Sequence, residues 1–101
     1  MTQAHDGQTV PAKVGNVLSL ELPSNPGSGY GWSLNSLDNT LLELIETRFL
    51  ATRDVPGSGG LQVWAVRARA AGRARISLKH WRPWEGEPSV IARFAVEVDI
   101  R

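Results

Sequence analysis

Residues 94–100 read FAVEVDI, and apolar side chains alternate there with polar or small ones along the whole segment. A period of two residues is typical of a β-strand with one face buried and the other toward solvent. Four large apolar residues would therefore point into a core, namely Phe94, Val96, Val98 and Ile100. The segment predicts a half-buried strand.

The same alternation recurs in four further segments, around residues 18–22, 30–34, 61–70 and 74–78. Glycine- and proline-rich stretches separate them, and short strands at regular spacing indicate an all-β sandwich or barrel. Trp32 and Trp64 have the inward parity of their strands and are expected in the core, since aromatic side chains each bury about 150–250 Å². Residues 41–50 fit helical spacing equally well, and their strand neighbours favour a strand or a short turn leading into one.

The chain of 101 residues is long enough for one domain and too short for two. We expect a single domain over residues 1–101, with residues 1–10 loosely ordered. A net charge of +1 argues against nucleic acid or an anionic membrane as the main partner. The absence of cysteine excludes disulfides and thiolate chemistry. No signal peptide or membrane span is recognisable, which fits a cytoplasmic protein or an exported one whose signal peptide has been removed.

Three breaks between the strands differ from ordinary turns. The first, residues 23–29, reads PSNPGSG: Pro26 stiffens its beginning, and Gly27 and Gly29 leave its tip without side chains. Such a tip suits insertion into a narrow cleft, although a flexible surface turn is an equal alternative at this stage. The second, residues 55–60, is again rich in glycine and by itself is only a weak signal.

The third break, residues 81–88, reads WRPWEGEP. Tryptophan and arginine are enriched at binding hot spots, and loops on a rigid scaffold are where recognition residues tend to lie. Trp84 is therefore predicted to bind a partner. Trp81 has two open interpretations, binding or capping the end of its strand.

Taken together, the three breaks resemble the chagasin family of inhibitors of papain-like cysteine peptidases. The family pattern has Asn-Pro-Thr-Thr-Gly-Tyr, then Gly-x-Gly-Gly, then Arg-Pro-Trp or Arg-Pro-Phe. The matching residues here are Asn25, Pro26, Gly27, Ser28, Gly29 and Tyr30, then Gly57, Ser58, Gly59 and Gly60, then Arg82, Pro83 and Trp84. The resemblance extends from Leu18 to the C-terminus.

The resemblance implies an immunoglobulin-like β-sandwich without a disulfide, which acts as a monomeric, reversible and competitive inhibitor. The first loop would lie over the catalytic cysteine of a papain-like peptidase, and the other two would clamp the walls of the cleft. Trp84 would pack beside the catalytic histidine, with Arg82 and Pro83 shaping its loop. The resemblance implies no catalytic residue, metal or cofactor.

Two departures from the family pattern affect the expected inhibition. Gly27 and Ser28 replace two threonines; Ser28 keeps a hydroxyl that we expect to be available in the cleft, while Gly27 adds flexibility. Ordering that residue would weaken binding by about 1 kcal/mol. His80 stands where relatives often have tyrosine, and its parity predicts a hydrogen-bonded packing residue that makes the loops sensitive to acid.

Other functions have weaker support in the sequence. Ser28 is not in a Gly-x-Ser-x-Gly elbow, and neither histidine belongs to a cluster with metal-ligand spacing, so we do not expect an enzyme. A second reading is a non-catalytic module that binds carbohydrate or single-stranded nucleic acid through exposed tryptophans and arginines. In that reading one face of a hairpin would carry Arg67, Arg69, Arg73, Arg75 and Lys79.

Overall fold

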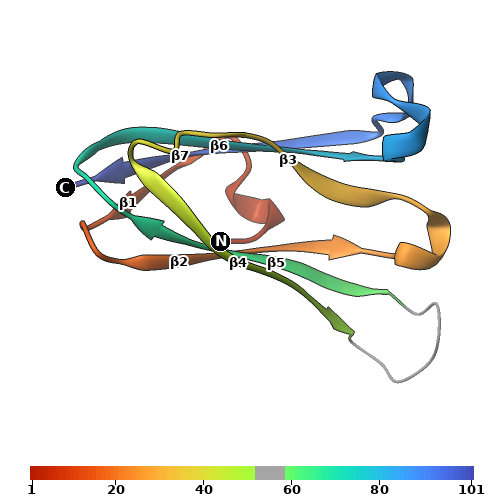
Figure 1. Ribbon diagram of the computed structural model, residues 1–101, viewed down its shortest axis with the longest axis horizontal. Helices are drawn as coiled ribbons and strands as arrows, with labels where there is room; N and C mark the ends of the chain where they lie inside the picture. Colours follow the sequence, from red (N-terminus) through yellow and green to blue (C-terminus); the bar gives the residue numbers. More distant parts are fainter. Residues whose placement is uncertain (52–58) are drawn as a thin grey trace.

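The computed structural model describes residues 1–51 and 59–101, which form two β-sheets packed face to face (Figure 1). The four-stranded sheet has the order β1 (Thr9–Ala12), β7 (Ala92–Ile100), β6 (Gly72–Trp81) and β3 (Gly31–Leu37). The three-stranded sheet has the order β2 (Val17–Ser24), β5 (Gly60–Ala68) and β4 (Leu42–Ala51). The all-β sandwich predicted from the alternating segments is confirmed.

The remaining regular elements of the described chain are four single-turn 3-10 helices: η1 (Gln3–His5), η2 (Pro26–Ser28), η3 (Pro83–Glu85) and η4 (Glu87–Ser89). Among the described residues there is no helix with the length and apolar character that crossing a membrane requires.

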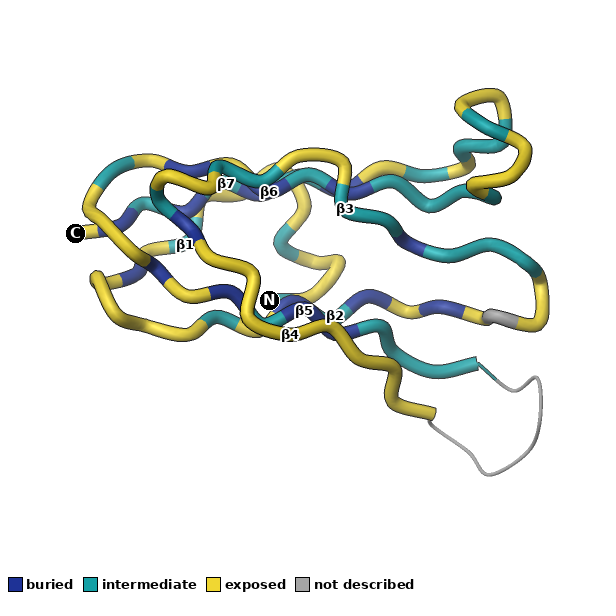
Figure 2. Tube along the Cα trace, in the orientation of Figure 1, coloured by how far each residue is buried: buried dark blue, intermediate teal, exposed yellow. Residues whose placement is uncertain are grey.

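Both sheets contribute to the core that lies between them. Figure 2 shows buried residues alternating with exposed or intermediate ones along β6 and β7, as the sequence predicts. Trp32 and Trp64 are each only 5% exposed, which confirms their expected place in the core. Burying one large apolar side chain contributes roughly 1.5–3 kcal/mol, so the fully buried residues hold the sandwich together without a disulfide. The largest of these are Phe94, Leu20, Leu22, Leu42, Ile76, Leu78, Val96 and Val98.

Strand β4 shows that the ambiguous segment 41–50 is a strand, in line with the favoured prediction. It lies at the edge of its sheet, pairs only with β5, and has a register shift between Leu44 and Glu46. Every residue of β4 after Leu42 is exposed (Figure 2). Its apolar residues after Leu42 therefore do not belong to the core.

The hairpin that the nucleic-acid interpretation requires, with Arg67 to Lys79 on one face, does not form. Strand β5 pairs with β2 and β4, whereas β6 pairs with β3 and β7 in the opposite sheet. The short link between β5 and β6 carries the chain from one sheet to the other. The five basic residues therefore do not line one face. Alternation reveals which residues point inward, but it carries no information about which strands pair.

The N-terminal residues, for which we expected loose order, make defined contacts with both sheets. The Met1 carbonyl accepts a hydrogen bond from the Glu21 amide (2.8 Å), and the Gly7 amide donates to the Ala95 carbonyl (2.8 Å). The carboxylate of Asp6 accepts from the Ala95 amide (2.9 Å). These bonds lead into β1, which pairs in parallel with β7. A proline in its four residues hides β1 in the sequence, because proline is rare inside strands.

Candidate functional site

The unusual breaks predicted from the sequence are brought to one end of the sandwich. The first loop (residues 25–30) joins β2 to β3, the second joins β4 to β5, and the third (residues 82–91) joins β6 to β7. In Figure 1 the third loop lies at the upper right, the first below it, and the ends of β4 and β5 lower still. Gly57 and Ser58 lie outside the described residues, so the described part of the second loop is Gly59.

The first loop is held by hydrogen bonds within itself. The Asn25 side-chain oxygen accepts from the Gly27 amide (3.1 Å), and the Asn25 carbonyl accepts from the Ser28 amide (3.0 Å) and hydroxyl (2.7 Å). The Ser28 hydroxyl in turn accepts from the Tyr30 amide (3.2 Å). The hydroxyl expected to be available in a cleft is thus turned into its own loop.

The third loop is closed by Ser89, which the sequence analysis did not identify. Its hydroxyl accepts from the Arg82 amide (3.0 Å) and lies 2.9 Å from the Arg82 carbonyl and 2.7 Å from that of Gly86. The loop is fastened to the sheet through Glu87, which bonds Lys79 (2.5 Å) and Arg93 (3.1 Å). These hydrogen bonds, from Lys79 first and then Arg93, lower the pKa of the Glu87 carboxyl.

The first and third loops are joined directly. The Arg82 guanidinium donates from Nη2 to the Ser28 carbonyl (3.0 Å), and its central carbon lies 4.3 Å above the Tyr30 ring. Gly29 has φ +81°, and a Cβ there would lie 3.1 Å from Cη2 of Trp84. The loops pack this closely only because position 29 lacks a side chain. Trp84 nevertheless remains 72% exposed.

The second loop contacts the beginning of the first through its glycines. Gly59 has φ +82°, and a Cβ there would lie 3.1 Å from the Ser24 carbonyl oxygen. A Cβ on Gly60 would collide with the Leu50 carbonyl oxygen and lie 2.8 Å from Cζ of Phe49. The glycines predicted at this position are therefore required by the close approach of neighbouring backbone.

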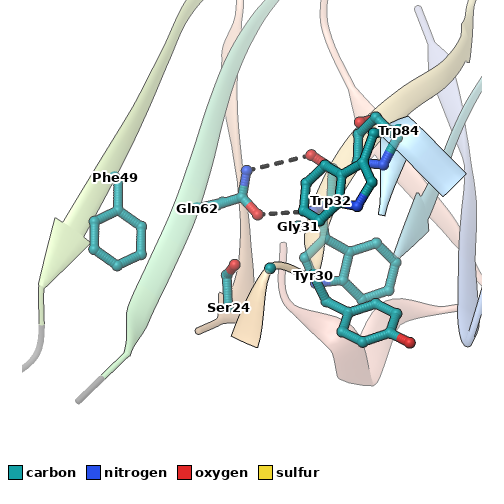
Figure 3. Close-up of a pocket in the computed structure, with 10 residues that line it drawn as sticks. Ser24, Tyr30, Gly31, Trp32, Phe49, Gln62 and Trp84 are labelled. Atoms are coloured by element: carbon teal, nitrogen blue, oxygen red, sulfur yellow. Dashed lines mark hydrogen bonds between the residues drawn. The ribbon is translucent and has the colours of Figure 1, made fainter. Parts of the chain in front are cut away.

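Trp32 connects the bases of all three loops. Its indole N–H donates to the carbonyl of Pro23, just before the first loop (2.9 Å). Its backbone N–H donates to Oε1 of Gln62 (2.8 Å), and its carbonyl accepts from Nε2 of Gln62 (3.2 Å), which reaches across from β5 (Figure 3). His80, just before the third loop, stacks on the Trp32 ring at 4.7 Å.

Gln62 was missed from the sequence although a signal for it exists. It has the same inward parity as Trp64 and Val66. A polar residue at an inward position must find a hydrogen-bond partner, and Gln62 finds two on the backbone of β3.

His80 packs as predicted but lacks the hydrogen bond expected at one of its nitrogens. Its ring lies between Trp32 and the edge of Tyr30, at 6.0 Å from the latter. In the described part of the chain, the buried Nε2 has no hydrogen-bond partner. Burial removes the ring from water, which disfavours its charged form and lowers the pKa of His80.

Trp81 has a structural role at the end of β6. Its indole N–H donates to the Ser33 hydroxyl (2.9 Å), and the Lys79 ammonium lies 3.5 Å from its ring centre. These contacts support the interpretation of Trp81 as a cap on its strand.

Four of the five basic residues considered for nucleic-acid binding have ion-pair or hydrogen-bond partners, in different parts of the molecule. Arg67 pairs with Glu43 (3.3 Å), Arg73 pairs with Glu97 (3.7 Å), and Arg69 donates to a backbone carbonyl (3.0 Å). Among residues 1–51 and 59–101, no group of three histidine, aspartate or glutamate side chains could hold a metal ion.

Comparisons with known proteins agree with this geometry. Residues 11–98 match the profile described as Chagasin family peptidase inhibitor. Chagasin of Trypanosoma cruzi is 31% identical over 101 residues, covering 95% of this chain and 92% of that protein.

Solved structures with the same fold include a cysteine protease inhibitor from Entamoeba histolytica, with a TM-score of 0.88 at 21% identity. This match covers 100% of this chain and 92% of that one. PbICP-C, solved in complex with falcipain-2, has a TM-score of 0.74 at 15% identity and covers 96% and 92% of the two chains.

Proposed function

The chain belongs to the chagasin family of peptidase inhibitors, and we propose that it blocks papain-like cysteine peptidases by placing its three-loop end in their active-site cleft. Inhibition is reversible and competitive, because the loops occupy the cleft and present no reactive group. The solved complex of PbICP-C with falcipain-2 supports a peptidase of this class as the partner.

The observation that carries the proposal is the direct coupling of the exposed loops. Arg82 bonds the Ser28 carbonyl, and Trp84 packs against Gly29, so the first and third loops form one surface. A surface that is ordered before binding loses less conformational entropy in the complex. Coupling of this kind suits a wedge that enters a cleft as one body.

Each matched residue then has a role in the wedge. Gly27, Ser28 and Gly29 enter the cleft over the catalytic cysteine, and Asn25, Pro26 and Tyr30 maintain the shape of the first loop. Gly57, Ser58, Gly59 and Gly60 contact one wall of the cleft, and Arg82, Pro83 and Trp84 contact the other.

Trp84 should contribute most to binding. It is the most exposed large apolar residue of the described chain, and tryptophan is the type most enriched at hot spots. An interface of ordinary size, roughly 800 Å² on each partner, concentrates its energy in a few such residues.

Titration of papain in reducing buffer with a fluorogenic peptide substrate tests the proposal. We expect competitive inhibition by the wild type and at least about thirtyfold weaker inhibition by Trp84→Ala, the effect of losing a hot spot of 2 kcal/mol or more. Val14→Ala, at an exposed apolar position in another loop, is the control and should inhibit like the wild type. Equal inhibition by all three proteins would contradict the assignment of the third loop, and no inhibition by the folded wild type would contradict the proposed target.

A further inference from the structure

A hollow of about 450 Å³ lies beside the three loops, on the side of the sandwich between β3 and β4. Phe49 forms one wall, Tyr30, Trp32 and Trp84 contribute to the other, and Gln62 lies between them (Figure 3). The hollow shares Gly29, Pro83 and Trp84 with the proposed binding end. It is therefore continuous with that end.

The hollow exists because two edge strands border this side. Strand β3 is the edge of the four-stranded sheet and β4 is the edge of the three-stranded one. Phe49 pairs in register with Gln62, whose side chain reaches the opposite sheet, so Phe49 faces the same inward side. Phe49 nevertheless remains 43% exposed, since no strand of the described residues covers this edge.

The chemistry of the lining selects an apolar occupant. Both ends of the Gln62 amide are already bonded to the backbone of Trp32. Four aromatic residues line the walls, with Ser24 and Ser33 as the other polar side chains of the lining. The Ser33 hydroxyl already accepts from the Trp81 indole. An apolar group entering the hollow would therefore gain by burial against the rings, whereas a polar group would lose water for few available partners, which costs free energy.

The Phe49 ring lies against Gly60, the first residue of β5. A Cβ on Gly60 would lie 2.8 Å from Cζ of Phe49, so the ring lies across a position that carries no side chain. The aromatic wall is thus built into the same end of the molecule as the glycines expected to contact the peptidase.

We infer that this hollow receives an apolar side chain from the rim of the peptidase's cleft, and that Phe49 is a specificity-determining residue of the inhibitor. The inference rests on the proposed function. The rim of a cleft wall that packs beside the three-loop end would meet this hollow, because the hollow shares Gly29 and Trp84 with that end. The hollow therefore favours peptidases whose rim presents an aliphatic or aromatic residue there.

Association and dissociation rates with papain test the inference, using Phe49→Ala and a matched control, Ile45→Ala. Both residues are 43% exposed on β4, but only Phe49 lines the hollow. We expect Phe49→Ala to dissociate about tenfold faster with little change in association, the usual pattern for loss of a buried apolar contact. Ile45→Ala should behave like the wild type, and equal thermal stability of the variants would show that folding is intact.

A photo-crosslinker gives a second, independent readout. With p-benzoylphenylalanine in place of Phe49, crosslinks should form to papain residues bordering the active-site cleft, and the same group in place of Ile45 should give none there. Unchanged dissociation of Phe49→Ala, or crosslinks only to a second inhibitor molecule, would overturn the inference. If the wild type fails to inhibit papain at all, the proposed function fails first, and that outcome is separate.

Discussion

The two ends of the sandwich close their loops in different ways. At one end, the turn at residues 13–16 is closed by the Lys13 amide, which donates to the Asn16 side chain (2.9 Å), and its backbone also bonds residues 68 and 101. The turn after β3 is closed through Asp38, whose carboxylate accepts from the Thr40 amide (3.1 Å) and hydroxyl (2.5 Å), and this turn also accepts hydrogen bonds from Arg69. These turns connect strands and have no exposed aromatic residue.

At the three-loop end, the decisive contacts run from one loop to another. Arg82 reaches Ser28, Trp84 lies against Gly29, and Gly59 lies against the carbonyl of Ser24. Hydrogen bonds to neighbouring segments occur at both ends, so what distinguishes this end is that the exposed Trp84 lies against another loop. An exposed tryptophan held in this way implies a requirement beyond chain reversal. In our account, that requirement is a rigid binding surface.

Two glycines give the sharpest comparison between the ends. Gly29 and Gly15 both have positive φ, +81° and +91°, but a Cβ would meet Trp84 at Gly29 and nothing within 4 Å at Gly15. Alanine at either position should cost about 1–2 kcal/mol of stability through backbone strain. Only Gly29→Ala should also weaken inhibition of papain, by about tenfold or more, because it separates the two loops.

Denaturant unfolding and papain inhibition, measured on both variants, separate these effects. Equal loss of inhibition by Gly15→Ala and Gly29→Ala would show that inhibition follows global stability and that the contact between the loops is irrelevant.

Gly27→Thr should strengthen inhibition of papain, whereas Gly29→Ala should weaken it. Gly27 lies in the 3-10 turn η2, a conformation that ordinary L-residues adopt, and its amide is already bonded to Asn25. Threonine there leaves the tip of the free inhibitor fewer conformations to lose on binding, which lowers the entropic cost by about 1 kcal/mol. The inhibition constant should therefore fall about fivefold. A higher or unchanged inhibition constant would mean that the flexibility of the tip does not limit binding.

His80 makes the stability of the three-loop end dependent on pH. Burial lowers the pKa of His80 below its ordinary 6.5, so the unfolded chain binds more protons than the folded one in mild acid. The stability associated with neutral His80 is complete above pH 6.5 and is lost as the pH falls through the lower, folded pKa. His80→Phe keeps an aromatic ring on Trp32 and should flatten this dependence.

Melting temperatures at pH 7.5 and 5.0 for the wild type and His80→Phe provide the measurement. An identical decrease in both proteins would assign the acid sensitivity to other groups.

Asp38 gives the smallest expected effect, at the other end. Hydrogen bonds from the Thr40 hydroxyl first, and then from the Thr40 amide, lower the pKa of Asp38 below 3.8. Its contribution to stability is present above pH 3.8 and is lost as the pH falls through the lower, folded pKa. Asp38→Asn should weaken this dependence slightly and leave inhibition of papain unchanged. A change in inhibition would contradict the separation of the two ends.

The sequence predicts much of this molecule, but unevenly. Alternation identifies the inward residues of β6 and β7, because burial on one face leaves a period of two. It does not show that β5 and β6 lie in different sheets, since pairing depends on residues far apart in the chain. It also places apolar residues on β4 without showing that they are exposed at an edge.

The candidate site shows the same division. Pro26, Gly29 and Trp84 stand out by composition, and the structure brings their loops together. The bond from Arg82 to Ser28 spans 54 positions and leaves no local pattern, and the closing role of Ser89 likewise depends on the folded loop. Gln62 could be predicted in part, because a polar residue at an inward position indicates a buried hydrogen bond, but the sequence does not show which group is its partner.

Protection of the peptidase's catalytic cysteine tests the central claim most directly. Papain saturated with the protein is treated with a small alkylating reagent, and the rate of modification of that cysteine is followed by mass spectrometry. If the first loop lies over the cysteine, the wild type should suppress alkylation almost completely, and Gly29→Ala should restore it at concentrations where the wild type still protects. Full inhibition of peptide hydrolysis with an unchanged rate of alkylation would contradict the account.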